Sequence, residues 1–353
     1  MAASPPPIRL PAQLARYTCG RSLVCCQTPW GVYLDGDEPD TIARHLADVG
    51  GLAPADARRR VAAALERPGR GLLSLRRRDG GCALLEAHGP ERGCSLQRAA
   101  GLGALPRTCQ TFPRLVTRVG DLVEVAFLLD CPTVARHVVA ARGGFAWAEL
   151  PARDFPYPVG RVAAAAIAWT ASRDVPRAEL LAWRAAWWAA LADAAEARAL
   201  GPALAALLLR PEAPGARDDA PSALLAWSPA WGGPISDALR RLHASEADLP
   251  APPPASALEE GPSEGALTAT LAQNGGALAL AASVLLQHAG VHDSRPALDA
   301  ARGAAWQTLV AAALAARLTD AGLGVDDALV MALSTAAQVA RTLPTSHRLG
   351  ASF

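Results

Sequence analysis

The stretch Asp121-Leu122-Val123-Glu124-Val125-Ala126-Phe127 decides the fold of the first half of the chain. Its residues alternate well enough to leave one face of a strand exposed to water, which favours an antiparallel sheet over a fully buried parallel one. We expect helices to cover the other face of that sheet. Other short runs in the first half also have the composition of strands. All the predicted strands together span residues 22–26, 31–34, 71–75, 82–86, 115–119, 122–129 and 145–150.

Two helix-like stretches lie between these strands, at residues 41–49 and 54–66, and Pro54 suits the first turn of the second. From about Gly160 the chain changes to long Ala- and Leu-rich segments, which predict an all-helical second half. These segments span 176–200, 202–209, 235–245, 266–289, 296–321 and 325–343, and two adjacent glycines at 275–276 are expected to split the fourth. The sequence therefore predicts an α+β fold, with a mixed, mostly antiparallel sheet domain followed by an all-α domain.

The domain organisation follows from length and cysteine distribution. A chain of 353 residues exceeds the size at which single cores usually stop growing, so two domains are expected. All seven cysteines lie in the first 131 residues, which also indicates a boundary. We predict a flexible N-terminus at 1–20, an α+β domain at 21–158 and a helical domain at 159–353. Within the helical domain, the segment 246–265 is rich in Pro and acids and predicts a disordered loop.

The composition carries information about the genome. Every one of the 34 basic side chains is an arginine, and Ala, Gly and Pro are abundant, which indicates extreme GC pressure. Such pressure is typical of certain large DNA viruses and some soil bacteria. The net charge of +1 creates no overall field that would attract nucleic acid or an acidic membrane.

Membrane insertion and export are not expected. The best apolar run, 275–286, is shorter than the roughly 20 residues that a spanning helix needs. The N-terminus has a proline cluster where a signal peptide would need a charged start and an apolar stretch. We therefore expect a soluble protein with reduced thiols in the cytosol or nucleus.

Signatures of common enzymes are missing from the sequence. It contains no P-loop, GxSxG, HExxH or CxxC motif, so no catalytic or cofactor-binding residue is predicted. Zinc ligands could come from Cys82, Cys94, Cys109, Cys131 and His137, but these residues lack the close pairs typical of structural zinc sites. We interpret these cysteines as small buried hydrophobes.

Two histidines have the spacing of a helical metal chelate. His288 and His292 stand four residues apart, but Gly290 interrupts the turn between them. The sequence favours solvated histidines at the end of a helix, and no metal site is predicted.

The densest charge feature is a stretch of arginines between residues 58 and 78. Its members Arg58, Arg59, Arg60, Arg76, Arg77 and Arg78 are candidates for phosphate contacts. The stretch contains acids at Asp56, Glu66 and Asp79 and lacks aromatic side chains for base stacking, so a solvated face is favoured. A nucleic-acid or phosphate-binding factor stays open as an alternative function.

The helical half contains an apolar stripe and several further tryptophans. Leu180, Trp183, Trp187, Leu191 and Ala194 recur at helical spacing and predict a face that packs in the core.

Trp188 lies off this stripe and four residues after Arg184, a spacing that allows the guanidinium to lie over the indole. Trp188 could equally be half exposed as an interface anchor. Trp227 and Trp231 lie in a Pro-containing loop and are further interface candidates, although a buried pair is the safer expectation for them.

The segment 22–36, SLVCCQTPWGVYLDG, resembles the double-cysteine motif of a family of herpesvirus and poxvirus regulators in the SUKH-like superfamily. Cys25 and Cys26 match the two cysteines, Trp30 and Tyr33 match the apolar positions, and the glycine comes late, at Gly36. The residues 69–75 followed by 82–85 are similar to the second signature of the family, and the resemblance covers about residues 17–150.

The resemblance implies a protein that acts by binding. Family members are tegument components, blockers of host cell-death or antiviral signalling, or immunity-type adaptors, and their motif cysteines are structural. They often carry two copies of the domain, whereas this chain has room for one. A tightly packed pair of thiols predicts that Cys26→Leu destabilises the fold, which a measurement of the free energy of unfolding would check.

These observations favour a non-enzymatic viral accessory or tegument protein that binds a host or viral protein, in the host cytoplasm or nucleus or in the virion tegument. Modulation of host antiviral or cell-death signalling is the expected role. A third alternative is an enzyme of a GC-rich bacterium whose site forms from residues distant in sequence. Its candidates are Asp35, Asp37, His137, Asp154 and His292.

Overall fold

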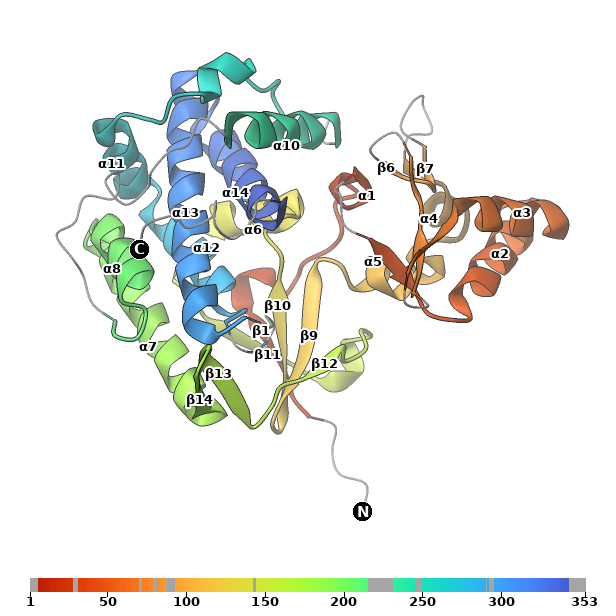
Figure 1. Ribbon diagram of the computed structural model, residues 1–353, viewed down its shortest axis with the longest axis horizontal. Coiled ribbons are helices and arrows are strands. Elements are labelled where there is room, and N and C mark those ends of the chain that lie inside the picture. Colours follow the sequence, from red (N-terminus) through yellow and green to blue (C-terminus); the bar gives the residue numbers. More distant parts are fainter. Residues whose placement is uncertain are drawn as a thin grey trace. The chain divides into compact units, whose positions relative to one another are not determined.

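The computed structural model describes residues 6–27, 31–69, 72–78, 81–86, 93–141, 144–214, 231–245, 249–289, 291 and 295–342 (Figure 1). The chain forms two compact units. Unit 1 combines Met1–Cys19 with Pro113–Phe353, and unit 2 is the intervening segment Gly20–Phe112. This division differs from the predicted boundary near residue 158, because the first strand of the chain belongs to the same sheet as strands that follow residue 113.

Unit 1 contains a five-stranded sheet with the strand order β11-β1-β10-β9-β12. The strands are β1 (Ile8–Pro11), β9 (Arg114–Val119), β10 (Leu122–Phe127), β11 (Trp147–Leu150) and β12 (Arg161–Val162). The sheet is mixed: β1 runs parallel to β10 and β12 parallel to β9, whereas the pairs β1–β11 and β9–β10 are antiparallel.

The N-terminal segment was predicted to be flexible, and the structure instead gives its described part a defined course. Residues 8–11 form β1, and the 3-10 helix η1 (Ala12–Leu14) follows. Ile8, Leu10 and Leu14 are all buried, so burial of alternate apolar side chains stabilises the ordered backbone.

Strand β10 differs from its expectation in one respect. Its alternation predicted a solvent-exposed face, but Val123, Glu124, Val125, Ala126 and Phe127 are all buried. The single charge in the strand is tolerated because a buried partner neutralises it, as described below.

A tight hairpin joins β9 to β10. Gly120 has φ +64°, in the left-handed region, and it follows directly after Val119 at the end of β9. Positive φ at the first residue of a two-residue turn is the geometry that matches the twist of antiparallel strands.

Contacts within unit 1 join the two points where unit 2 is inserted. Arg114, next to the downstream point, donates a hydrogen bond from Nη2 to the carbonyl oxygen of Tyr17, near the upstream point, at 3.2 Å. The Arg114 guanidinium also lies 4.7 Å from the ring centroid of Tyr17 and 4.2 Å from that of Tyr157. The chain therefore leaves unit 1 and returns to it at neighbouring positions.

The rest of unit 1 is largely helical, and α13 packs against α14, α12, α11 and α8 (Figure 1). The helices are α6 (Pro132–Ala141), η3 (Ala152–Asp154), α7 (Arg177–Glu196), α8 (Leu200–Leu209), α10 (Gly232–Ser245), η5 (Ala255–Leu258), α11 (Glu264–Gln273), α12 (Gly275–Leu286), α13 (Ala297–Asp320) and α14 (Val325–Thr342).

The apolar stripe of α7 packs in the core, as predicted. Leu180, Trp183, Trp187 and Leu191 are buried. The indole nitrogens of Trp183 and Trp187 both donate to the carbonyl oxygen of Pro211, at 2.6 and 2.7 Å, so the polar edge of each ring has a partner.

Three features of the helical half refine its prediction. The hairpin of β13 (Ala166–Thr170) and β14 (Arg173–Pro176) precedes α7, so this half is not all helix. The predicted split at the two glycines is confirmed, since α11 ends at Gln273, α12 begins at Gly275, and the two axes are bent by 85°. The segment 246–265 was predicted to be disordered, but its described part contains η5, whose Leu258 is buried, and the start of α11.

Unit 2 combines short helices with small antiparallel sheets. The strands are β2 (Val32–Leu34), β3 (Leu65–Gly69), β4 (Leu72–Leu75), β5 (Arg77–Arg78), β6 (Gly81–Cys82), β7 (Leu85–Glu86) and β8 (Gly93–Cys94). The helices are α1 (Val24–Gln27), α2 (Glu38–Asp48), α3 (Pro54–Ala64), α4 (Ser95–Ala100), η2 (Leu102–Ala104) and α5 (Arg107–Thr111). Ile42, Leu46, Val61 and Leu96 lie in its core.

The predicted fold class is confirmed. Mixed and antiparallel sheets in the N-terminal region precede a helical C-terminal region, and 56% helix with 17% strand corresponds to an α+β protein. In the described part of the chain, no single helix is both long enough and apolar enough to span a membrane.

Candidate functional site

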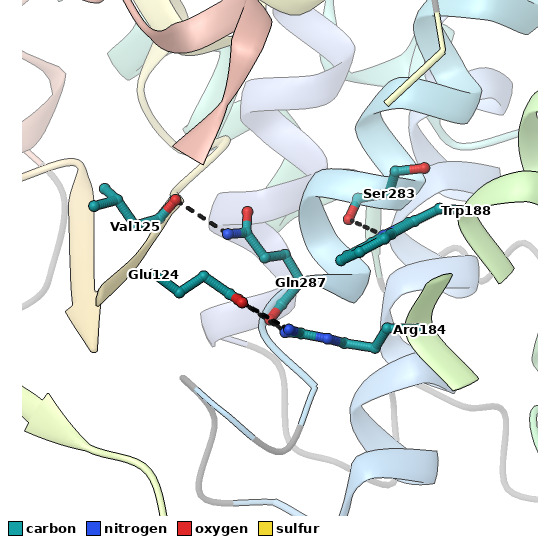
Figure 2. Close-up of polar contacts among 6 residues, drawn as sticks. All are labelled: Glu124, Val125, Arg184, Trp188, Ser283 and Gln287. Carbon is teal, nitrogen blue, oxygen red and sulfur yellow. Dashed lines mark hydrogen bonds and ion pairs between the residues drawn. The ribbon is translucent and has the colours of Figure 1, made fainter. Parts of the chain in front are cut away.

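A buried ion pair joins the central sheet of unit 1 to its helices. Glu124 on β10 accepts hydrogen bonds from Nη1 and Nη2 of Arg184 on α7, at 2.9 and 2.8 Å (Figure 2). The side chains of Arg184 and Glu124 are only 1% and 2% exposed. Gln287, just after α12, completes the network: its carbonyl oxygen accepts from Arg184 Nη1 at 2.6 Å, and its Nε2 donates to the carbonyl oxygen of Val125 at 3.1 Å.

The ion pair continues a row of charges across the sheet. Strand register places Arg9 opposite both Glu124 on β10 and Glu149 on β11, so the three side chains share one face. Arg9 Nη2 lies 3.4 Å from Glu149 Oε1, and the Glu149 side chain is 62% exposed. The row therefore runs from the solvent at the outermost strand to the buried pair Glu124–Arg184.

An aromatic cluster of Phe145, Trp147 and Trp188 lies beside this row. The rings of Phe145 and Trp188 stack with centroids 4.4 Å apart, and Trp147 contacts Trp188 edge-on at 5.3 Å. All three side chains are half-buried. Trp188 is fixed further by a hydrogen bond from Nε1 to the carbonyl oxygen of Ser283 at 3.1 Å (Figure 2).

The contact of Arg184 with Trp188 was predicted from sequence spacing and is present. The Arg184 guanidinium lies 5.3 Å from the ring centroid of Trp188. Trp147 has a similar contact with Arg9, at 5.4 Å. The cluster thus includes a residue of the outermost strand, Trp147 on β11, and two of its rings are in contact with arginine side chains.

The other tryptophan candidates lie elsewhere. Trp231 is 3% exposed and contacts Trp306 edge-on at 5.5 Å, so it contributes to the core. Trp227 lies outside the described residues.

The double-cysteine segment of unit 2 forms a helical turn, not the predicted strand. Cys25 and Cys26 belong to α1, and their Sγ atoms are 4.0 Å apart, so the two thiols do not point to opposite faces. Arg21 and Leu23, just before α1, have φ of 56° and 61°, in the left-handed region that side chains rarely adopt. A run of four apolar residues is ambiguous between strand and helix, which explains the wrong prediction.

The other motif positions are not packed as the resemblance implies. Tyr33 on β2 is 49% exposed, although the motif places an apolar residue there. A Cβ added to Gly36 would meet no atom within 4 Å, so packing does not require a glycine at this position. Trp30 lies outside the described residues.

Unit 2 gathers the thiols of its cysteines around one core. Cys82 is buried in the core, and Cys26, Cys94 and Cys109 are packed against it. Their environment raises the pKa of Cys82, Cys94 and Cys109, chiefly through burial. None of the seven cysteines of the chain forms a disulfide.

The pKa values of Cys25 and Cys26 are shifted in opposite directions. The hydrogen bond between the two thiols lowers the pKa of Cys25 and raises that of Cys26, and burial adds to the rise at Cys26. Arg77 donates from Nη2 to the carbonyl oxygen of Cys26 at 3.3 Å, so a positive charge lies nearby.

Most of the candidate phosphate-binding arginines have partners within unit 2. Arg76 and Arg78 donate to the carbonyl oxygens of Leu65 and Ala63, both at 3.1 Å. They thus provide hydrogen-bond donors for carbonyl groups at the C-terminal end of α3.

The arginines on α3 are more exposed. Arg59 pairs with Asp56 one turn away, and Arg60 lies 3.1 Å from Glu86. Arg58 is exposed on the same helix. A second arginine, Arg98, also bonds to Glu86, and this bond lowers the pKa of the Glu86 carboxyl.

The candidates for metal binding and catalysis are distributed over both units. Cys82, Cys94 and Cys109 belong to unit 2, whereas Cys131 and His137 belong to unit 1. The Cys131 Sγ lies 3.4 Å from the hydroxyl of Tyr17, whose pKa is raised by burial. Within the described ranges, no three His, Cys, Asp or Glu side chains are grouped so as to hold a metal ion.

The acidic and histidine candidates show the same division. Asp35 and Asp37 belong to unit 2 and Asp154 to unit 1, while His292 lies outside the described residues. His288 was expected to be solvated, but it is half-buried and its Nε2 lies 3.1 Å from the carbonyl oxygen of Phe127.

Sequence reasoning missed the pair Glu124–Arg184, although the signal was present. Arg184 is four residues after Leu180 and three before Trp187, so it lies on the buried stripe of α7. An arginine on such a stripe requires a buried acid, and Glu124 is the one acid in an apolar strand.

Comparison of the chain with protein-family models, with curated proteins and with solved structures found no match.

Proposed function

We propose that this chain is a non-enzymatic viral accessory or tegument protein that acts by binding a host or viral protein. Its place of action is the host cytoplasm or nucleus, or the virion tegument, and its role is to modulate host antiviral or cell-death signalling. The arginine-only basic composition supports the viral part of this proposal, and the double-cysteine resemblance supports it in sequence alone.

The aromatic cluster of Phe145, Trp147 and Trp188 carries the binding part. Tryptophan and arginine are enriched among the residues that dominate the affinity of protein interfaces. Here three aromatic rings remain half-buried next to the outermost strand, and stacking, a hydrogen bond and two arginines fix their orientation. Because the rings are already ordered, little side-chain entropy is lost when a partner covers them.

Affinity purification with mass spectrometry tests this proposal. The tagged chain is purified from transfected cells with nuclease treatment and compared with Trp147→Ala. We expect a defined protein partner that survives nuclease and whose recovery falls about tenfold or more in Trp147→Ala, the range of a strong interface residue.

Tyr33→Ala is the matched control, because Tyr33 is an exposed aromatic side chain of unit 2. Both variants should first show thermal unfolding midpoints close to that of the unmodified chain. Equal recovery of the partner with Trp147→Ala would exclude the aromatic cluster as the binding surface. Loss of every partner after nuclease would contradict the proposal and favour nucleic-acid binding by the arginine stretch.

A further inference from the structure

Two neighbouring thiols of unit 2 lie close to each other. Cys25 and Cys26 lie in one helical turn with their Sγ atoms 4.0 Å apart, and both side chains are half-buried. We propose that Cys25 and Cys26 form an oxidation-sensitive dithiol, which a hydroperoxide converts to a disulfide between these adjacent residues. This inference is independent of the proposed binding function.

The surroundings of the pair favour the reactive thiolate form at Cys25. The two thiols share a hydrogen bond, and with Cys26 as its donor this bond stabilises a negative charge on Cys25, in the direction of the lowered pKa of Cys25. The Arg77 guanidinium bonds to the backbone of Cys26 and adds positive charge to the site. Cys82, Cys94 and Cys109, in contrast, have raised pKa values and are poorer nucleophiles at neutral pH.

The chemistry balances with a peroxide as the oxidant. The Cys25 thiolate attacks the O–O bond of hydrogen peroxide, which leaves a sulfenic acid on Cys25 and releases hydroxide. The sulfur of Cys26 then attacks the sulfur of Cys25, an S–S bond forms, and the sulfenic oxygen leaves as water with the proton of Cys26. Overall, two thiols lose two electrons and two protons, and the peroxide becomes two molecules of water.

Closing this disulfide requires α1 to unwind. A disulfide has an S–S length of about 2.04 Å and usually joins Cα atoms about 4.4–6.8 Å apart, whereas consecutive Cα atoms are about 3.8 Å apart. The helical backbone of Cys25 and Cys26 must therefore change. The change is confined to α1, a single turn that follows left-handed residues at Arg21 and Leu23.

Peptide mapping can locate the product unambiguously, because trypsin cleaves this lysine-free chain only after arginine. Cys25 and Cys26 share the tryptic peptide 22–44, while every other cysteine lies in a different peptide. The folded full-length chain is treated with increasing hydrogen peroxide, the remaining thiols are alkylated, and the digest is analysed by mass spectrometry. We expect peptide 22–44 to become lighter by two hydrogen atoms and resistant to alkylation before any other cysteine reacts, and dithiothreitol to reverse the change.

Single substitutions define the role of each sulfur. Cys25→Ser should abolish the reaction, whereas Cys26→Ser should leave a sulfenic acid on Cys25 that a dimedone probe traps. Cys94→Ser is the matched control, since it removes another half-buried thiol of the same core and should leave oxidation of peptide 22–44 unchanged.

Other products would overturn the proposal. A disulfide that links peptide 22–44 to a second peptide would show that Cys25 and Cys26 do not join each other. Oxidation of the exposed Cys19 with peptide 22–44 still fully alkylated would show that accessibility alone decides the reaction. These outcomes are read from the unmodified chain, so they hold even if a substitution impairs folding.

Discussion

Glu124 carries a negative charge in the middle of a buried strand, and its whole environment is arranged around that charge. The positively charged Arg184 donates two hydrogen bonds to its carboxylate. The carbonyl oxygen of Gln287, just after α12, accepts another hydrogen bond from Arg184, and the side-chain amide of Gln287 donates to the backbone of β10. Removing one partner of such a buried pair strongly destabilises a folded protein, whereas replacing both partners with well-packed apolar side chains can leave its stability unchanged.

Removing one partner of this pair should therefore destabilise unit 1 strongly. We expect Arg184→Met to lower the free energy of unfolding by about 3–5 kcal/mol, because Glu124 then remains charged and buried. Glu124→Leu combined with Arg184→Met should recover most of that loss. Denaturant titration of both variants measures the effect.

Glu149→Gln, which removes the exposed pair with Arg9, is the control and should lower the free energy of unfolding by less than about 1 kcal/mol. A loss no larger than that of the control would refute the role assigned to Arg184.

Glu86 provides a pH-dependent contribution within unit 2. Its pKa is lowered from 4.5, first by the hydrogen bond from Arg98 and then by Arg60. A carboxyl whose pKa is depressed in the folded state contributes stability above its unfolded pKa and loses it as the pH falls through the folded pKa. Glu86→Gln should therefore reduce the free energy of unfolding at pH 7 and flatten its decline below pH 4.5. Chemical denaturation at several pH values tests this, and parallel curves for the two proteins would contradict it.

Among the elements, the hairpin between β9 and β10 depends on one residue. Gly120 has φ +64°, and a Cβ there would approach Arg177 Nη2 to 2.9 Å. Gly120→Ala should lower the free energy of unfolding by about 1–2 kcal/mol, the cost of a left-handed conformation for a residue with a side chain. Gly36→Ala is the control, since its Cβ meets nothing and its φ is not positive. A similar loss in both variants would show that backbone strain at Gly120 is unimportant.

The long helices could be predicted because proline or glycine marks where they begin. The predicted helix at 54–66 corresponds to α3 (Pro54–Ala64), and that at 296–321 to α13 (Ala297–Asp320). The segment 22–26 was wrongly predicted as a strand, since its short apolar run fits a strand or a helical turn equally well. The aromatic cluster could be predicted only in part, because Trp188 meets Phe145 and Trp147 through tertiary packing that no local pattern records.

For the whole molecule, the boundary between the units could not be predicted from composition. Unit 2 interrupts unit 1, and the pairing that reveals this, β1 with β10, joins residues more than a hundred positions apart. Local sequence patterns contain no information about such a pairing.

Unit 1 should fold without unit 2. The carbonyl oxygen of Tyr17 and the Arg114 side chain are within hydrogen-bonding distance, so a short Gly/Ser linker can join Cys19 to Pro113. We expect this shortened chain to unfold cooperatively on heating and to retain the far-ultraviolet circular dichroism of a helical protein. An isolated Gly20–Phe112 segment serves as the complementary sample. A shortened chain without a cooperative transition would show that unit 1 needs the inserted segment.

The place of β1 also determines the order in which a ribosome can complete this protein. Residues 8–11 are synthesised well before the strands that flank them, because β10 ends only at Phe127 and β11 at Leu150. At about 5–20 residues per second, the first strand waits on the order of ten seconds for its neighbours. Unit 2 is one continuous segment, so all the residues that contact one another within it are synthesised during that interval. Unit 2 can thus fold while the rest of unit 1 is still being synthesised. Until β10 and β11 have been made, β1 is unpaired and must not pair with the edge strand of another sheet.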